Sequence, residues 1–335
     1  MKIVFAHFNS KIPKHLILNL KRSVVLFPNH QIYLITDQEI SKIRISNLSI
    51  LKYHSSDDWN SLEKLLNHPR NFRNNFWFTS LARFIAIAEF VKEHNEEIMH
   101  VESDVIISDD FPFEVFSNLN VDYAFPVVNS ELAIASCLYI GNKNAADALI
   151  KATLESATQH NLTTDMQILK QIIKYKNTKF QLLPSSTNSK ETLDNADLDF
   201  LFETKNALLK FSGIFDGYDI GLYLFGEDPR NNRGFSKLRA RKYVNYLNVR
   251  NLNLVSKFDR EFPFVVDSKN SDLIPIYSLH IHSKNANLFK VNRIKRFVIK
   301  AVRNSKKQPI TIFSPTKFIW AVKKSIIRRI SNKNY

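Results

Sequence analysis

The chain has 335 residues, of which 44% are hydrophobic and 12% aromatic, so it can bury a substantial core and is too apolar for a disordered protein. Its six glycines form neither a GxGxxG nor a GxxxxGKS/T pattern, which argues against a dinucleotide-binding Rossmann domain and a P-loop. The net charge of +15 is uneven, because residues 290–335 hold 14 Lys and Arg and no acid, whereas the rest of the chain holds 33 basic and 32 acidic residues.

The first part of the chain alternates between strand and helix patterns. Short apolar or alternating runs predict strands at 2–8, 31–37, 47–53 and 97–107. Apolar residues at helical spacing predict helices at 13–27 and 76–94. This order predicts an α/β fold with a mostly parallel sheet that helices cover on both faces. Ligands bind such sheets at the carboxyl ends of the strands, where Asn9, Asp37, Glu102 and Asp104 all fall.

The second part continues the pattern with longer gaps. It predicts strands at 122–128, 135–141 and 274–285, and helices at 143–160 and 162–175. Residues 184–210 are polar and then acidic, and they give no clear assignment. Residues 213–235 hold most of the glycines together with several Asp and Arg, and they predict a loop. Such a loop could close over a bound substrate and exclude water, or it could be a plain surface loop.

Two acids, Glu102 and Asp104, interrupt the apolar segment 97–107. A carboxylate beside apolar surface is costly unless it is paired or binds a metal. An acid-x-acid pair at a strand end lets two carboxylates approach one hard cation while a diphosphate supplies further oxygens. In the strand 274–285, His280 and His282 fall on one face, and imidazole also suits Mn²⁺. Solvated loop acids and structural histidines are the alternatives.

Together these segments resemble the GT-A class of nucleotide-sugar-dependent glycosyltransferases. That class has an N-terminal strand that cups the nucleotide, an arginine-bearing helix, a DxD motif and a late histidine. The corresponding segments here are FAHFN (5–9), SLARFIAIAEF (80–90), ESD (102–104) and LHIHSK (279–284). The stretch 215–235 also resembles segments of bacterial enzymes that build capsule or lipopolysaccharide. The resemblance spans roughly residues 1–290, and it departs from the DxD motif at Glu102.

The resemblance implies a metal-dependent transfer of a sugar from a nucleotide-sugar donor, a UDP-sugar being favoured, to a growing capsule or lipopolysaccharide glycan. The cofactor would be Mn²⁺ or Mg²⁺. Phe8, Asn9 and Asp37 would contact the base and the ribose of the donor, and Glu102 would contact the ribose.

The same resemblance implies roles around the diphosphate. Asp104 would be the firmer metal ligand, with His282 preferred over His280. Lys284 would neutralise the departing nucleoside diphosphate as a point charge. Arg83 would lie near the donor sugar or the diphosphate, unless it pairs on its own helix face with an acid such as Glu89.

Three further acids are candidates for catalysis at the acceptor. Asp165 lies where many such enzymes place an acid beside the acceptor, and it would act as general base if the reaction inverts. Its alternative role is to cap the helix that begins near Thr164. Asp216 and Asp219, on the predicted loop 213–235, are rival catalytic acids.

The basic segment 290–335 is predicted to be an amphipathic helical tail outside a catalytic domain of residues 1–289. Apolar and basic side chains separate onto opposite helix faces at 291–307 and again at 316–330. Such helices suit the surface of an anionic membrane, where the enzyme would meet a lipid-linked acceptor. Packing of the helices on the catalytic domain and binding of nucleic acid, the less favoured reading, are the alternatives.

Localisation follows from the N-terminus and the composition. The first ten residues read as a strand, and no apolar run suits a signal peptide or a membrane span. A single cysteine, Cys137, allows no intramolecular disulfide and fits a reducing compartment. We therefore expect a cytoplasmic protein bound peripherally to the inner face of the membrane. A non-catalytic carbohydrate- or nucleic-acid-binding protein on the same scaffold is the alternative function.

Overall fold

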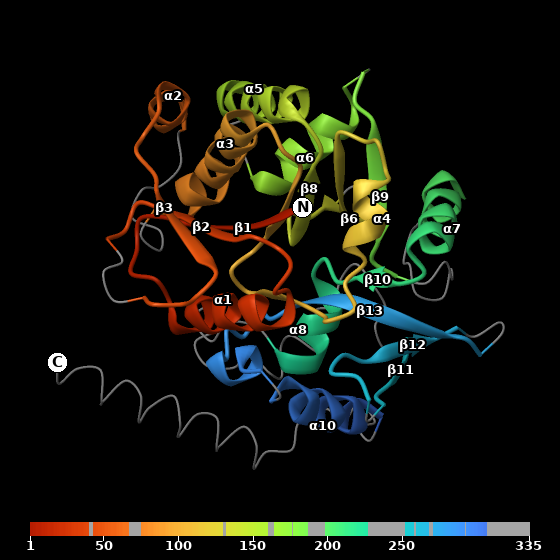
Figure 1. The fold of residues 1–335 in the computed structure, drawn as a ribbon. Helices are drawn as coiled ribbons and strands as arrows, with labels where there is room; N and C mark the ends of the chain where they lie inside the picture. The colour runs from red at the N-terminus through yellow and green to blue at the C-terminus, as the bar shows by residue number, and fades with distance from the viewer. Residues whose placement is uncertain are drawn as a thin grey trace, which may run out of the picture.

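The fold is taken from a computed structural model of the chain. The structure describes residues 1–39, 43–66, 75–129, 132–159, 164–175, 177–186, 198–226, 252–257, 259–267, 271–291 and 293–306. These residues form two sheets with helices around them (Figure 1).

The larger sheet has eight strands in the order β3-β2-β1-β4-β8-β6-β7, with β9 beside β6. Four strands at one end run parallel, namely β3 (Leu48–Lys52), β2 (Ile32–Thr36), β1 (Lys2–His7) and β4 (Ile98–Val101). The other half contains β8 (Cys137–Ile140), β6 (Tyr123–Asn129), β7 (Leu132–Ala133) and β9 (Phe180–Pro184). There β8 is antiparallel to β4 and to β6, β7 is antiparallel to β6, and β9 is parallel to β6. The predicted α/β fold with a mostly parallel sheet is confirmed.

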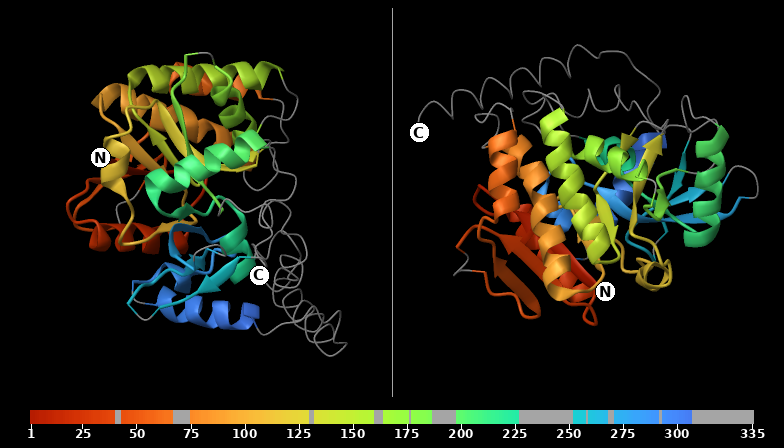
Figure 2. Two further views of the ribbon diagram at one scale, coloured as in Figure 1. Left: turned by 90° about the vertical axis from the view of Figure 1, so that its right-hand side faces the viewer. Right: turned by 90° about the horizontal axis from the view of Figure 1, so that it is seen from above.

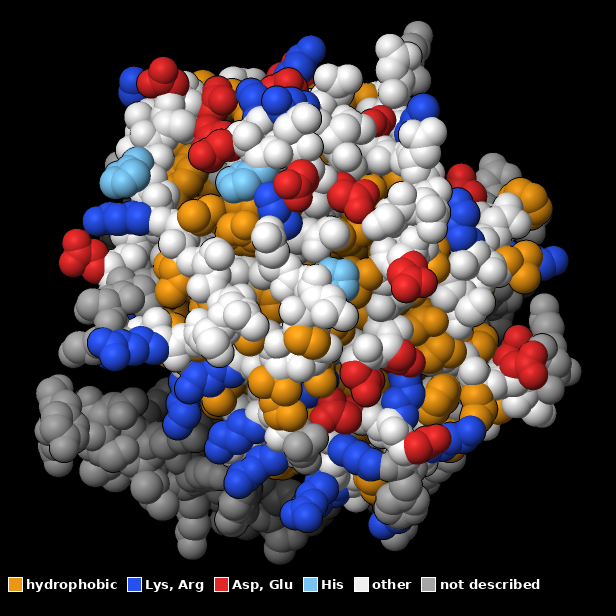
Figure 3. Space-filling model, viewed as in Figure 1, with side chains coloured by type: hydrophobic (Ala, Val, Ile, Leu, Met, Phe, Trp, Pro, Cys, Tyr) orange, Lys and Arg blue, Asp and Glu red, His pale blue; other side chains and the backbone are white. Residues whose placement is uncertain are grey.

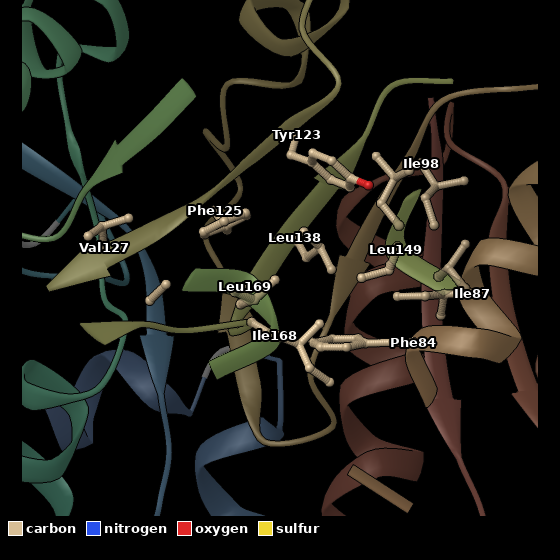
Figure 4. Packing of buried hydrophobic residues seen from close by; sticks show 14 of the residues in the cluster. Phe84, Ile87, Ile98, Tyr123, Phe125, Val127, Leu138, Leu149, Ile168 and Leu169 are labelled. Atoms are coloured by element: carbon tan, nitrogen blue, oxygen red, sulfur yellow. The ribbon is translucent and has the colours of Figure 1, made fainter. Parts of the chain in front are cut away.

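Helices cover both faces of this sheet (Figures 1 and 2). One face carries α2 (Asp57–Leu65), α3 (Phe76–His94), α5 (Lys143–Gln159) and α6 (Asp165–Ile173), and the other carries α1 (Lys14–Leu26) and α4 (Phe113–Ser117). Side chains that alternate along β1 divide between the two layers: Val4 joins the core under α3, whereas Ile3 and Phe5 pack with Leu16 of α1. Figure 4 shows Phe84 of α3 within the first of these cores.

A second sheet lies beside the first, and the sequence did not predict it. It has the order β10-β13-β12-β11, formed by β10 (Ile214–Phe215), β13 (Leu273–His280), β12 (Phe264–Val266) and β11 (Asn253–Val255). The short strand β5 (Val105–Ile107) pairs antiparallel with β13. The segment 97–107, predicted as a strand, therefore forms two strands, and the two acids follow the end of the first one, as expected for acids at a strand end. The chain leaves the large sheet after Val101 and enters the second sheet at Val105, so Glu102 and Asp104 lie between the two sheets.

The prediction of a loop over 213–235 is wrong for its described part. Residues 214–215 form β10, and α8 (Asp219–Phe225) follows, largely buried. Gly221 is needed for packing, because a Cβ there would lie 2.0 Å from the carbonyl oxygen of His280. A core helix cannot act as a lid, and residues 227–235 lie outside the described residues. The unassigned stretch 184–210 contains most of α7 (Leu198–Phe211).

The start of the basic segment packs on the domain. After the 3₁₀-helix η1 (Ala286–Phe289), α10 (Ile294–Lys306) contacts η1 and α8. Its buried apolar side comprises Ile294, Val298, Ala301 and Val302. Arg296, Lys300 and Arg303 are exposed, and Lys and Arg gather over this lower part of the surface in Figure 3. The first predicted tail helix thus packs on the domain, whereas the second, 316–330, lies outside the described residues. Within the described part of the chain, no helix is long and apolar enough to cross a bilayer.

Candidate functional site

Glu102 and Asp104, between β4 and β5, lie beside His280 at the end of β13. One ligand atom from each of these side chains lies within 4.8 Å of the other two. The Nε2 atom of His280 is 3.6 Å from Glu102 Oε2 and 3.6 Å from Asp104 Oδ1. The cause is the pairing of β5 with β13, which sets His280 opposite Val105. A ligand set of two carboxylates and one imidazole fits a divalent cation such as Mn²⁺.

The two histidines differ in what their rings face. The Nδ1–H of His280 donates to the carbonyl of Gly217 (2.7 Å), which leaves its Nε2 directed at the carboxylates. The Nε2–H of His282 donates instead to the carbonyl of Tyr218 (2.9 Å), and the two rings stack with centroids 3.9 Å apart. The predicted preference for His282 over His280 is therefore reversed by the geometry.

Positive groups balance the two acids. Lys284 Nζ lies 3.2 Å from Asp104 Oδ2. Although burial raises the pKa of Asp104, Lys284 and His280 outweigh it and hold that pKa well below its usual value. Burial lowers the pKa of His280, but the carboxylates of Asp104 and Glu102 outweigh burial and raise it to about 9. A protonated His280 and Lys284 therefore compensate the negative charge of the two carboxylates.

Arg83 adds a further positive group to this charge array, at Glu102, whereas Lys284 lies at Asp104. Its Nη1 pairs with Glu102, and its Nη2 lies 2.6 Å from Asp165 Oδ2. The alternative partner Glu89 instead accepts a hydrogen bond from Tyr53 (2.6 Å). Burial raises the pKa of Asp165, and Arg83 offsets this only in part.

Asp165 is not the helix cap that the sequence left open. Thr164 caps α6 through its side chain, and Gln167 completes the capping box. Asp165 occupies the first turn of the helix and reaches Arg83 with a side chain that is 20% exposed. The structure thus brings Asp165 to the same charge array as Glu102 and Asp104.

Asp216 and Asp219 do not lie on a loop. Asp216 is 1% exposed, and its carboxylate accepts from the backbone N–H groups of Ile220 (3.0 Å), Gly221 (2.7 Å) and His280 (3.0 Å). It ties the start of α8 to β13 and fixes the backbone of His280, so the predicted catalytic role is replaced by a structural one. Asp219 is 2% exposed at the start of α8, away from solvent.

The predicted nucleotide-contacting residues separate into two groups. Asn9, with φ 57°, donates its backbone N–H to the Asp37 carboxylate (2.9 Å), which joins the carboxyl ends of β1 and β2. Phe8 is 5% exposed, and its ring makes T-shaped contacts with Tyr53 and Trp59, so it is too buried for a base to stack on it. Its predicted contact with the base is not supported by this placement.

One buried polar side chain beside the acids was not predicted. Asn19 of α1 is 1% exposed and donates to the carbonyls of Ser103 and Val105, on either side of Asp104. Its signal in the sequence is a lone amide on the apolar face of the helix, between Leu16 and Leu20.

No protein-family model matches the chain, and no curated protein matches it. Its similarities are to solved structures of glycosyltransferases. The galactosyltransferase LgtC, in complex with donor and acceptor sugar analogs, is 15% identical over 56% of this chain and 77% of that chain, with a TM-score of 0.41. The glycosyltransferase GlyE of Streptococcus pneumoniae is 20% identical over 53% of this chain and 44% of that one (TM-score 0.37). Mouse xyloside xylosyltransferase 1 is 8% identical over 55% and 84% (TM-score 0.38). At such distances the activity of this chain has to be inferred from its own site.

Proposed function

We propose that the protein is a metal-dependent glycosyltransferase that moves a sugar from a nucleotide-sugar donor, with UDP-sugars favoured, to an acceptor glycan. The observation that carries the proposal is the cluster of Glu102, Asp104 and His280 between the two sheets, with Lys284 beside it. Acids and an imidazole around one point, next to a lysine, suit a cation and a diphosphate bound together. The carboxyl ends of the parallel strands β1 and β4 lie side by side, and ligands of α/β sheets bind at this edge.

The cation would be held by Asp104, Glu102 and His280. Bound there, Mn²⁺ or Mg²⁺ would supply Lewis-acid stabilisation of the charge on the diphosphate leaving group. The chemistry of the donor set supports this assignment, because two carboxylates and an imidazole nitrogen converge on one point, with Asp104 buried and Glu102 partly buried.

The surrounding side chains would bind the donor, position the acids and accept the proton of the acceptor. Lys284, with its side chain 30% exposed, would meet the departing phosphate as a point charge once the donor binds. Asn9 and Asp37, at the neighbouring strand ends, would bind the nucleoside. Arg83 would hold Glu102 and Asp165 in place beside the donor sugar. In an inverting reaction, the Asp165 carboxylate would accept the proton of the acceptor hydroxyl.

The acceptor that we favour is a lipid-linked capsule or lipopolysaccharide glycan at the inner face of a membrane. The support is electrostatic: residues 290–335 carry 14 basic residues and no acid. Three of them, Arg296, Lys300 and Arg303, are exposed on α10. Each such side chain near an anionic bilayer contributes about 1 kcal/mol of binding free energy. Since the apolar side of α10 is buried in the domain, α10 itself would contribute charge rather than insertion.

Chelation tests the proposal. We expect the purified protein with Mn²⁺ to release nucleotide from one class of UDP-, GDP- or CMP-sugar when a suitable acceptor extract is present. EDTA should lower this rate by at least about 100-fold, because the charge on the leaving group loses its main stabilisation, and added Mn²⁺ should restore it. Nucleotide release is measured by chromatography. Binding of glycan or nucleic acid that is indifferent to EDTA, with no nucleotide release, would favour the non-catalytic alternative.

A further inference from the structure

Asn19 holds the backbone on both sides of Asp104. Its amide nitrogen Nδ2 lies 2.6 Å from the Val105 carbonyl oxygen and 3.3 Å from the Ser103 carbonyl oxygen. An amide NH₂ carries two protons, so one side chain can donate to both carbonyls at once. Since α1 is far from this segment in the sequence, the contact is a tertiary restraint on the acid-bearing turn.

Asp104 itself is held from the opposite side. The backbone N–H of Ile281 donates to the Asp104 carbonyl (2.7 Å), and the N–H of Ser108 donates to the carbonyl of Tyr277 (2.8 Å). The backbone groups of Asp104 and Ser108 therefore bond toward β13, while the Val105 carbonyl points toward α1, as alternation along a strand requires. Three consecutive carbonyls, those of residues 103 to 105, are thus all fixed.

The need for a polar residue at position 19 follows from the buried edge of β5 that faces α1. Within the described residues β5 pairs with β13 alone, so the carbonyls on its other edge have no strand to bond. Asn19 takes the Val105 carbonyl, and Arg22, one turn later on α1, donates to the Ile107 carbonyl (3.4 Å) while pairing with Glu261 (2.5 Å). A buried carbonyl without a partner costs about 1–3 kcal/mol, which α1 avoids with these two side chains.

We propose that Asn19 is a positioning residue of the cation site, an inference that rests on the proposed function. By fixing the carbonyls of Ser103 and Val105, it restricts the backbone from which the Asp104 side chain projects. The Asp104 carboxylate then stays within reach of His280 and Glu102. Among the described residues, the Asn19 side chain hydrogen-bonds to the carbonyls of Ser103 and Val105 and not to the acid side chains, so it acts through the backbone of the turn.

The test compares cation affinity with stability. Isothermal titration of the full-length protein with Mn²⁺ alone should show Asn19→Leu binding about 10–100-fold more weakly than the wild type, as is typical when a group that orients metal ligands is removed. Tyr123→Phe is the matched control. It also removes a buried side-chain donor to a backbone carbonyl, that of Ala145, but at a strand away from the site. Both variants should melt at lower temperature, and only Asn19→Leu should lose Mn²⁺ affinity.

The outcomes separate the two proposals. If the wild type binds no Mn²⁺, both the proposed function and the role of Asn19 are overturned. If the wild type binds and Asn19→Leu binds equally well, only the role of Asn19 is overturned. Should Asn19→Leu fail to fold, Asn19→Ser is titrated instead. Its hydroxyl has a single donor and a shorter reach, so weakened Mn²⁺ binding is again expected, and wild-type affinity contradicts the inference.

Discussion

Asp104→Asn is expected to lower kcat/KM for sugar transfer by about 10³-fold or more, a loss of about 4 kcal/mol in transition-state stabilisation. The substitution keeps the shape of the side chain and removes its charge. That charge lies 3.6 Å from the His280 ring nitrogen and 3.2 Å from the Lys284 ammonium. Because Asp104 contributes one of the two carboxylates in the cluster, a cation and the diphosphate with it would be held far less tightly. Initial rates of nucleotide release over a range of donor concentrations give kcat/KM and measure the effect.

Asp109→Asn is the matched control for this prediction. Asp109 is an exposed acid a few residues beyond Asp104, past the end of β5. The same change of charge there should leave the rate within about twofold of the wild type, since surface substitutions away from special features have small effects. Equal losses in the two variants, or full activity in Asp104→Asn, would contradict the role given to Asp104.

Arg83→Leu is expected to destabilise the protein by about 3–5 kcal/mol in addition to lowering activity. Arg83 is 13% exposed and pairs with two partly buried acids, Glu102 (12%) and Asp165 (20%). Removing the guanidinium leaves the Asp165 carboxylate without its ion-pair partner and leaves Glu102 with His280 as its remaining cationic neighbour. Adding Asp165→Asn to this variant should recover part of the stability, because one uncompensated charge is then removed. Denaturant unfolding at neutral pH measures both changes.

Lys92 on the same helix provides the comparison for Arg83. Its pair with Asp147 (2.6 Å) is exposed, with the two side chains 40% and 58% accessible. Lys92→Met should therefore cost no more than about 1 kcal/mol. If Arg83→Leu were as mild as Lys92→Met, Arg83 would be an ordinary surface cation, and the charge array around Glu102 would need another explanation.

The parts of the fold that the sequence predicts correctly are those set by local periodicity. The helix over 76–94 and the strands that end near Asp37 and Val101 carry strong apolar patterns, and the structure has them. The second sheet was missed because its strands come from distant parts of the chain. The pairing of β5 with β13 is a long-range choice that no local pattern encodes. The same pairing brings His280 to the two acids.

The prediction of a loop over 213–235 was wrong for its described part because it was based on the glycines of that segment. The glycines of 213–226 favoured a loop, whereas Gly221 is required by the close approach of α8 to the His280 carbonyl. Once that segment is a buried helix, Asp216 becomes an acceptor for three backbone N–H groups instead of a catalytic acid. The choice between His280 and His282 likewise depends on which carbonyl each ring meets, and sequence spacing carries no such information.

Cation-dependent binding of a nucleotide-sugar tests the central claim most directly. The melting temperature of the full-length protein would be measured with UDP-, GDP- and CMP-sugars, each with and without Mn²⁺, in the wild type and in Asp104→Asn. A ligand that binds the folded state raises the midpoint according to its occupancy. We predict a rise with one nucleotide class that requires Mn²⁺ and disappears in Asp104→Asn. A rise that is independent of Mn²⁺ and of Asp104, or no rise with any donor, would contradict a cation and diphosphate site at the cluster of Glu102, Asp104 and His280.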